Sequence, residues 1–217
     1  MGDQPYFHVI IQRFDDKADE SFFRATRSIV ERVRRKAPGV LETYFAPNVS
    51  AFAAGWSHVR MTKFATRASH EAFQVSPIHE EAVQLMLPRM RYAVGDLDLA
   101  TMTQSMVPPT EVGSDGFPYY HIVLFRAKWA FDSAFLAKLR SHQARIVREI
   151  PGLIEYHFEE NISPFGDGWD WVHLSKFTSR EAHDAYQEHD AHHALRDMLM
   201  PQVEDAVAGD VDTSQLV

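Results

Sequence analysis

The chain has 217 residues, of which 45% are hydrophobic and 24% charged, and its formal net charge is −8. These values are typical of a soluble globular protein. They argue against nucleic acid or an anionic membrane as a partner, because both bind basic surfaces. No apolar run is long enough to span a membrane, and the first residues do not resemble a secretory signal. The absence of cysteine excludes disulfides, thiolate catalysis and Cys-ligated metals. We therefore expect a cytoplasmic protein.

The chain contains an internal repeat at an offset of 113 residues. The segment "PGVLETYFAPNVS" (38–50) aligns with "PGLIEYHFEENIS" (151–163), and "GWSHVRMTKFATRASHEAFQ" (55–74) aligns with "GWDWVHLSKFTSREAHDAYQ" (168–187). No gap is needed from Pro5 to about Met90. This self-similarity predicts a duplicated unit. We expect a first repeat over 1–103, a linker rich in Pro, Gly and Ser over 104–117, and a second repeat over 118–217.

Both repeats predict the same elements in the same order. An apolar strand ("FHVIIQRF" or "YHIVLFRA") leads to a helix with Asp19 or Asp132 as its N-cap. That helix ends at a Pro-Gly pair. Two further strands, a second helical region and a short last strand complete a ferredoxin-like β-α-β-β-α-β order, an α+β fold. The middle strands are expected over 40–46, 57–65, 153–159 and 170–178.

The first strand is apolar on both faces, with Val9 and Ile11 on one side and His8 and Ile10 on the other. Helices on one side of a sheet leave its other side to be covered, and the sheet of the sister repeat is available for this. We therefore expect the two sheets to pack face to face as a dimeric α/β barrel within one chain.

The second helical region is predicted to be broken. Ser76-Pro77 fits an N-cap followed by proline at the first helical position, and His189-Asp190 takes the same place in the second repeat. His79 and His192 then lie in the first turn of a new helix. The positive end of the helix dipole disfavours imidazolium, so both rings should be neutral, as a general base must be.

Several motifs together resemble the stress-responsive dimeric α+β barrel (Dabb) family. They are the strand histidine of "YHIVLF", "IPGL.E" after the first helix, "ENIS", "GWD", "F.SREA..AY" and "H.AH". Members are usually single units that dimerise through their sheets, so the resemblance implies a fused dimer. A plant polyketide cyclase of this family works without a cofactor through a His–Tyr–His pocket. Its three positions correspond to His121, Tyr186 and His192, whereas the first repeat keeps His8 and His79 but has Phe73 in place of the tyrosine.

The resemblance implies a cofactor-free acid–base site. His192 would be the base, Tyr186 would hydrogen-bond a developing oxyanion, and His121 would orient the substrate or relay the proton. His8 and His79 are the corresponding candidates of the first repeat. The alternative is structural, with a partly buried strand histidine and histidines that cap a helix. The tyrosine-equivalent position and the alternation along the third strand of each repeat give five candidates for substrate contact: Phe73, His58, Arg60, Trp171 and His173. The alternative is that these side chains only pack in the core and at its rim.

A metal site is not predicted. His189, His192 and His193, with Asp190, have a spacing that can chelate an ion. The first repeat, however, has Ser76 in place of His189, and no HExxH-like pair occurs.

Two classes of function follow. The first is a cofactor-independent lyase or cyclase for an aromatic or polyketide-like molecule, using aldol or retro-aldol chemistry with possible loss of a small aldehyde. Its nearest competitor is a cofactor-free monooxygenase of quinols or anthrones. The second class is a stress-associated ligand-binding protein without turnover. An aromatic content of 12% suits a ring-bearing ligand. We expect no nucleic-acid or membrane partner, and a homodimer of the fused barrel is an open possibility.

Overall fold

The computed structural model describes residues 4–101 and 116–216. It contains two four-stranded antiparallel sheets, one in each repeat, with strand orders β2-β3-β1-β4 and β6-β7-β5-β8. The first repeat comprises β1 (Tyr6–Phe14), α1 (Glu20–Lys36), β2 (Val40–Pro47), β3 (His58–Phe64), α2 (Arg67–Gln74), α3 (Pro77–Met86) and β4 (Met90–Asp98). The second comprises β5 (Tyr119–Ala127), α4 (Ser133–Glu149), β6 (Leu153–Glu160), β7 (Trp171–Phe177), α5 (Arg180–Gln187), α6 (Asp190–Leu199) and β8 (Val203–Asp212). The α+β fold and its duplication are confirmed.

The helix signals in the sequence act as predicted. The Asp19 carboxylate accepts a hydrogen bond from the backbone N–H of Phe22 at 2.9 Å, and Asp132 accepts one from Phe135 at 2.7 Å. Each satisfies a donor at the start of its helix that has no partner within the helix. Past the end of α1, Gly39 has a φ of +74°, a conformation that glycine adopts without steric cost.

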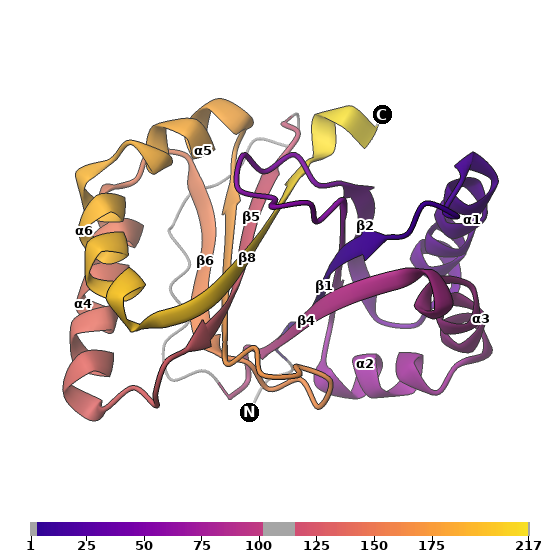
Figure 1. Ribbon diagram of the computed structural model, residues 1–217, viewed down its shortest axis with the longest axis horizontal. Coiled ribbons are helices and arrows are strands. Elements are labelled where there is room, and N and C mark those ends of the chain that lie inside the picture. Colours follow the sequence, from indigo (N-terminus) through magenta and orange to yellow (C-terminus); the bar gives the residue numbers. More distant parts are fainter. Residues whose placement is uncertain (1–3, 102–115, 217) are drawn as a thin grey trace.

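The two sheets face each other, and the helices lie on the two outer sides (Figure 1). Phe7, Val9 and Ile11 of β1 pack in one buried cluster with residues of β5 such as Ile122 and Leu124. This confirms the predicted barrel of two sheets within one chain. Burial of this shared apolar face removes both sheets from water, which is the main favourable contribution to such packing.

Two glycines allow the sheets to approach each other closely. A Cβ atom on Gly95 of β4 would lie 2.5 Å from a methyl carbon of Leu124, and one on Gly209 of β8 would lie 2.7 Å from a methyl carbon of Val59. Both contacts cross from one repeat to the other, so a side chain at either glycine would push against the opposite sheet.

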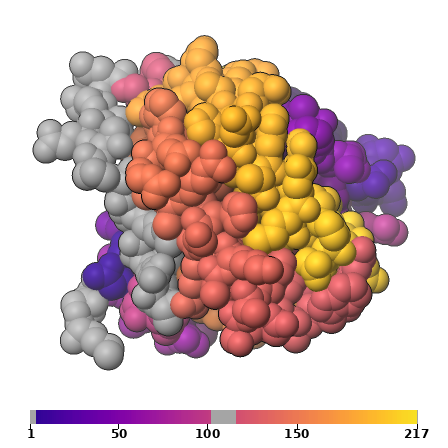
Figure 2. All heavy atoms as spheres, turned by 90° about the vertical axis from the view of Figure 1, so that its left-hand side faces the viewer, coloured from indigo at the N-terminus to yellow at the C-terminus, as the bar shows by residue number. Residues whose placement is uncertain are grey.

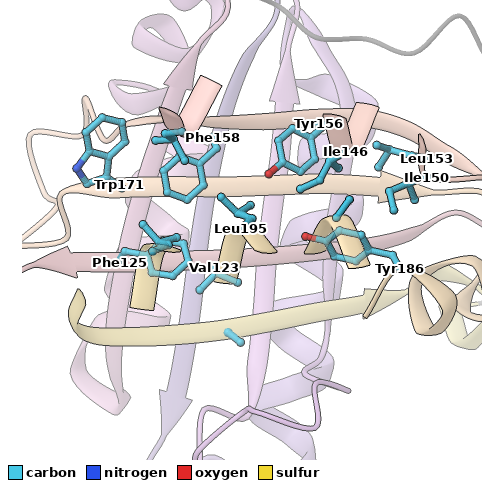
Figure 3. Packing of buried hydrophobic residues seen from close by; sticks show 14 of the residues in the cluster. Val123, Phe125, Ile146, Ile150, Leu153, Tyr156, Phe158, Trp171, Tyr186 and Leu195 are labelled. Atoms are coloured by element: carbon cyan, nitrogen blue, oxygen red, sulfur yellow. The ribbon is translucent and has the colours of Figure 1, made fainter. Parts of the chain in front are cut away.

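The outer face of the second sheet is covered by its own helices. Its core joins residues of β5, β6 and β7 to residues of α4, α5 and α6 (Figure 3). Seen from outside, this half presents a continuous surface of α4, α5, α6 and β8 (Figure 2). The break predicted in the second helical region is also present, since α5 ends at Gln187 and α6 begins at Asp190.

Loops cross between the repeats and fasten each to the last strand of the other. The side chain of Asn48, after β2, accepts a hydrogen bond from the backbone N–H of Asp210 at 2.9 Å and donates to the carbonyl of Ala208 at 2.9 Å. Asn161, after β6, makes the reciprocal bonds to the N–H of Asp96 at 3.0 Å and the carbonyl of Val94 at 2.9 Å. Each asparagine therefore positions a backbone segment of the opposite repeat.

The predicted linker 104–117 lies outside the described residues except for its last two positions, so its boundaries stay a prediction. None of the described helices has both the length and the apolar character needed to cross a bilayer.

Candidate active site

His121 is held by a carboxylate behind it. The side chain of His121 projects from β5 toward the helices and is buried, and its Nδ1 lies 2.7 Å from Oδ1 of Asp210 on β8. The other oxygen of Asp210 accepts a hydrogen bond from the Tyr119 hydroxyl at 3.0 Å. Burial by itself raises the pKa of the Asp210 carboxyl, but His121 and Tyr119 outweigh it and hold the pKa below its ordinary value. Asp210 is therefore a carboxylate at neutral pH, and it orients His121 with Nε2 as the free nitrogen.

His192 is fixed in a similar way by a neutral acceptor. Its Nδ1 donates to the backbone carbonyl of Gln187, at the end of α5, at 3.0 Å. Burial lowers the pKa of His192 to about 4, with smaller contributions from neighbouring charges. The ring is therefore neutral at pH 7, as its place in the first turn of α6 predicts, and its Nε2 keeps a lone pair.

Tyr186 lies between the two histidines. Its ring centroid is 4.4 Å from that of His192 and 6.4 Å from that of His121. Burial raises the pKa of the Tyr186 phenol well above its ordinary value, so it is a hydrogen-bond donor at any physiological pH. In Figure 3 the Tyr186 hydroxyl points toward the interior of the cluster, as does that of Tyr156. The Tyr156 hydroxyl is buried and has no hydrogen-bond partner among the described residues.

The side chains of His121, Tyr186 and His192 line one cavity of about 300 Å³ between the sheet and the helices. Most of its wall is apolar, as is typical of small-molecule sites. Phe52, from the loop after β2, is the one wall residue supplied by the first repeat within the described chain. The lining is formed by Phe52, His121, Val123, Phe125, Phe158, His173, Tyr186, Gln187, His192, Leu195, Arg196, Leu199, Met200, Ala206 and Ala208.

The predicted substrate-contact residues of β7 separate into two environments. His173 lines the cavity, its ring centroid is 5.5 Å from that of His121, and burial lowers its pKa well below its ordinary value. Trp171 lies on the same face of the strand but stacks against Phe131 and Phe158 at 5.0 and 5.7 Å. It lines a different cavity of about 260 Å³ beside α4.

The first repeat keeps part of this arrangement. Nδ1 of His8 lies 2.6 Å from Oδ1 of Asp96, as in the second repeat. The ring of His79 packs against Phe73, which takes the place of the tyrosine, with centroids 5.0 Å apart. Burial first, and then the charge of Arg60, lower the pKa of His79 to about 4.

The two candidates from β3 have different surroundings. The guanidinium of Arg60 lies over the Phe73 ring, with its central carbon 5.8 Å from the ring centroid. His58 is stacked between Phe23 and Phe45 at 4.6 and 5.1 Å, and burial lowers its pKa to about 4. His58 is thus part of an aromatic cluster at the end of the strand.

Residues 119–213 match the sequence profile of the family described as the stress responsive A/B barrel domain (Dabb). The second repeat is a Dabb domain. A Dabb family protein with a ferredoxin-like fold from Mesorhizobium loti is 26% identical over 44% of this chain and 95% of its own, with a TM-score of 0.38. No curated protein matches the sequence.

Two solved structures are similar to nearly the whole chain, including this Dabb domain. An anthrone oxidase-like protein is 11% identical, with a TM-score of 0.68, over 97% of this chain and 91% of its own. A proposed monooxygenase from Fusobacterium nucleatum is 9% identical, with a TM-score of 0.67, over 98% and 93%. At these identities the likeness shows the fold, in which two ferredoxin-like halves form one barrel.

The carboxylates behind the histidines were missed in the sequence, although a signal for them exists. Asp96 follows glycine in "VGDLD" (94–98), and Asp210 does so in "AGDVD" (208–212) of the Dabb domain. The two motifs are 114 residues apart, whereas the rest of the repeat is offset by 113. The register shift between Arg126 and Ala127, where β5 pairs with β8, accommodates the extra residue.

The His189–His193 run, whose spacing could chelate an ion, is not among the groups of clustered metal-ligand side chains in the described residues. His189 caps α6, with its Nδ1 accepting the N–H of Ala191 at 3.1 Å. The donor atoms that lie within 4.8 Å of one another belong instead to His121, His183 and Asp210 of the Dabb domain, and to their counterparts His8, His70 and Asp96. Sets of two histidines and a carboxylate suit transition metals. Here, however, Nδ1 of His121 and Oδ1 of Asp210 form a hydrogen bond with each other, so neither atom is free to bind an ion in this arrangement.

Proposed function

We propose that the second repeat is a cofactor-independent acid–base enzyme of lyase or cyclase type that acts on an aromatic or polyketide-like small molecule. One observation carries the proposal. Two imidazoles, each held at Nδ1 by an acceptor and therefore free at Nε2, line one apolar cavity together with a buried phenol. This combination supplies a proton acceptor and an oxyanion donor in a mostly apolar site.

We assign the proton acceptor to His121. Taking up a proton creates a positive imidazolium, and Asp210 behind His121 stabilises that charge, as an acid partner does for a general-base histidine. His192 has only a neutral carbonyl behind it, and its pKa of about 4 makes it a weak base at pH 7. This exchanges the roles expected from the sequence, in which His192 was the base.

Tyr186 and His192 then act on the other side of the reacting group. His121 removes a proton from a carbon next to a carbonyl, or from a hydroxyl group. The electron pair moves onto oxygen, where the Tyr186 hydroxyl donates a hydrogen bond to it. Aldol closure or retro-aldol cleavage follows, and the imidazolium returns the proton to the product. His192, 4.4 Å from Tyr186 between ring centroids, orients that phenol and the substrate.

A monooxygenase is the second candidate because the same proton removal would create an electron-rich quinol or anthrone anion for attack on oxygen. The likeness to an anthrone oxidase-like protein supports the fold needed for it. Oxygen uptake during turnover separates the two chemistries, since lyase and cyclase reactions consume none.

The test is a mass-spectrometric screen of the full chain against phenolic dimers and polyketide analogues, with detection of released small aldehydes and of oxygen uptake. We expect Tyr186→Phe, which removes one hydroxyl and reproduces the Phe73 of the first repeat, to lower kcat by about 10²–10³-fold. The matched variants are His192→Gln and His79→Gln, which change the same position in the two repeats. Loss of turnover in both, or in neither, would contradict a site in the second repeat. Ligand binding without turnover of any compound would leave the binding-protein reading in its place.

A further inference from the structure

Arg60 is a buried cation in the middle of the first repeat. It lies on β3 between Ile10 of β1 and Phe45 of β2 and faces α2, and only 3% of its surface is exposed. Nε and Nη2 of its guanidinium are buried and have no hydrogen-bond partner among the described residues. Burial alone lowers the pKa of Arg60, to about 10, so the group stays charged at neutral pH.

This arrangement is costly in the protein alone. Burying a charged group with two unpaired N–H donors costs free energy, because those donors lose their hydration without gaining a hydrogen bond. Among the described residues no carboxylate forms an ion pair with Arg60, and Asp96 pairs with His8 instead. The neighbouring ring of His79 is neutral, and the Phe73 ring offers only its face. A partner from outside the chain would remove the penalty.

The free donors indicate the class of that partner. Nε–H and Nη2–H lie on one edge of the planar guanidinium and point in the same direction, a pair that matches the two oxygens of a carboxylate. We infer that the first repeat binds a small carboxylate anion on this edge of Arg60, on the side of β3 that faces α2. The low exposure of the side chain limits the ligand to a small acid, or to the carboxylate end of a longer one.

The second repeat does not share this site. His173 stands where Arg60 stands, and Tyr186 where Phe73 stands. Two exchanges thus turn a neutral proton-handling cavity into an anion site of opposite chemical preference. The inference does not depend on catalysis by the second repeat.

The test is a formate titration of the full chain in low-salt buffer, followed by thermal unfolding and calorimetry, with the neutral isostere formamide in parallel. We expect the Tm of the wild type to rise saturably, by roughly 5–10 °C at a hundredfold excess over Kd, with no response to formamide. Arg60→Met should not respond to formate, and without anion it should be at least as stable as the wild type. Arg126→Met removes a guanidinium that is bonded to the Gly168 carbonyl, and it should respond like the wild type.

Arg60→Lys provides a second route if Arg60→Met does not fold. It keeps the charge but not the paired donors, so the formate concentration at half-saturation should rise at least tenfold. No saturable response in the wild type, an equal response to formamide, or an unchanged half-saturation in Arg60→Lys would each overturn the inference.

Discussion

Replacing Asp210 with asparagine tests the proposed proton acceptor. Asparagine keeps the shape of the side chain but removes its charge. If the charge centres of Asp210 and a protonated His121 lie about 4 Å apart, they attract by about 4 kcal/mol at an effective dielectric constant of about 20. Each factor of ten in rate corresponds to about 1.4 kcal/mol. A transition state with half to full positive charge on His121 therefore predicts a fall in kcat of about 30- to 1,000-fold. KM should change little, because Asp210 does not line the cavity.

The assay is steady-state turnover of the substrate found in the screen, with unfolding measured on the same samples. Asp96→Asn is the matched control, because Asp96 bonds to His8 in the first repeat as Asp210 bonds to His121. Both variants should lose a similar 1.5–3 kcal/mol of stability through a weakened charged hydrogen bond, but only Asp210→Asn should lose turnover. Full activity in Asp210→Asn, together with inactivity of His192→Gln, would refute the reasoning and return the role of base to His192.

Three further predictions concern the support of the site. Asn48→Ala should lower kcat, because it removes the hydrogen bonds that fix the strand carrying Asp210. Asn161→Ala removes equivalent bonds to the first repeat, so it should cost similar stability but leave kcat within twofold. Equal effects of the two variants on kcat would contradict this. Gly209→Val should destabilise the chain by about 1–3 kcal/mol in urea unfolding, because its side chain meets Val59 across the sheets; a neutral result would mean that the sheets can move apart. The free energy of unfolding should fall as pH drops from about 6.5 toward 4, because His192 binds a proton in the unfolded chain at a higher pH than in the folded one, where its pKa is about 4. His192→Gln should reduce this dependence of stability on pH. An unchanged dependence would argue against a buried neutral ring.

The fold could be predicted because duplication and local signals agree. The self-alignment gave two units, and Asp19 and Asp132 marked the helix starts that their hydrogen bonds confirm. The two apolar faces of the first strand required a second sheet against it, and Val9 and Ile11 are buried at that interface. Each inference needed only contacts within a repeat, or the rule that apolar faces are covered.

The site was predicted less completely, because its supporting contacts join distant parts of the chain. His121, Tyr186 and His192 came from family motifs, and the structure places them around one cavity. Asp210 was missed because one extra residue near the last strand breaks the constant offset. The alternation of β3 assigned Arg60 to a face of the sheet, but periodicity contains no information on whether a buried charge has a partner.

The crossed loops have a consequence for how such a chain can diverge. Asn48 and Phe52 belong to the first repeat. Asn48 nevertheless hydrogen-bonds the backbone of Asp210 in the second repeat, and Phe52 lines the cavity of the second repeat. In an assembly of two identical subunits, any substitution alters both pockets at once. Here the halves are encoded separately, so one pocket is free to change its chemistry while its loop goes on completing the neighbouring one. Cutting the chain between the repeats would therefore leave the cavity of the second repeat without one of its wall residues.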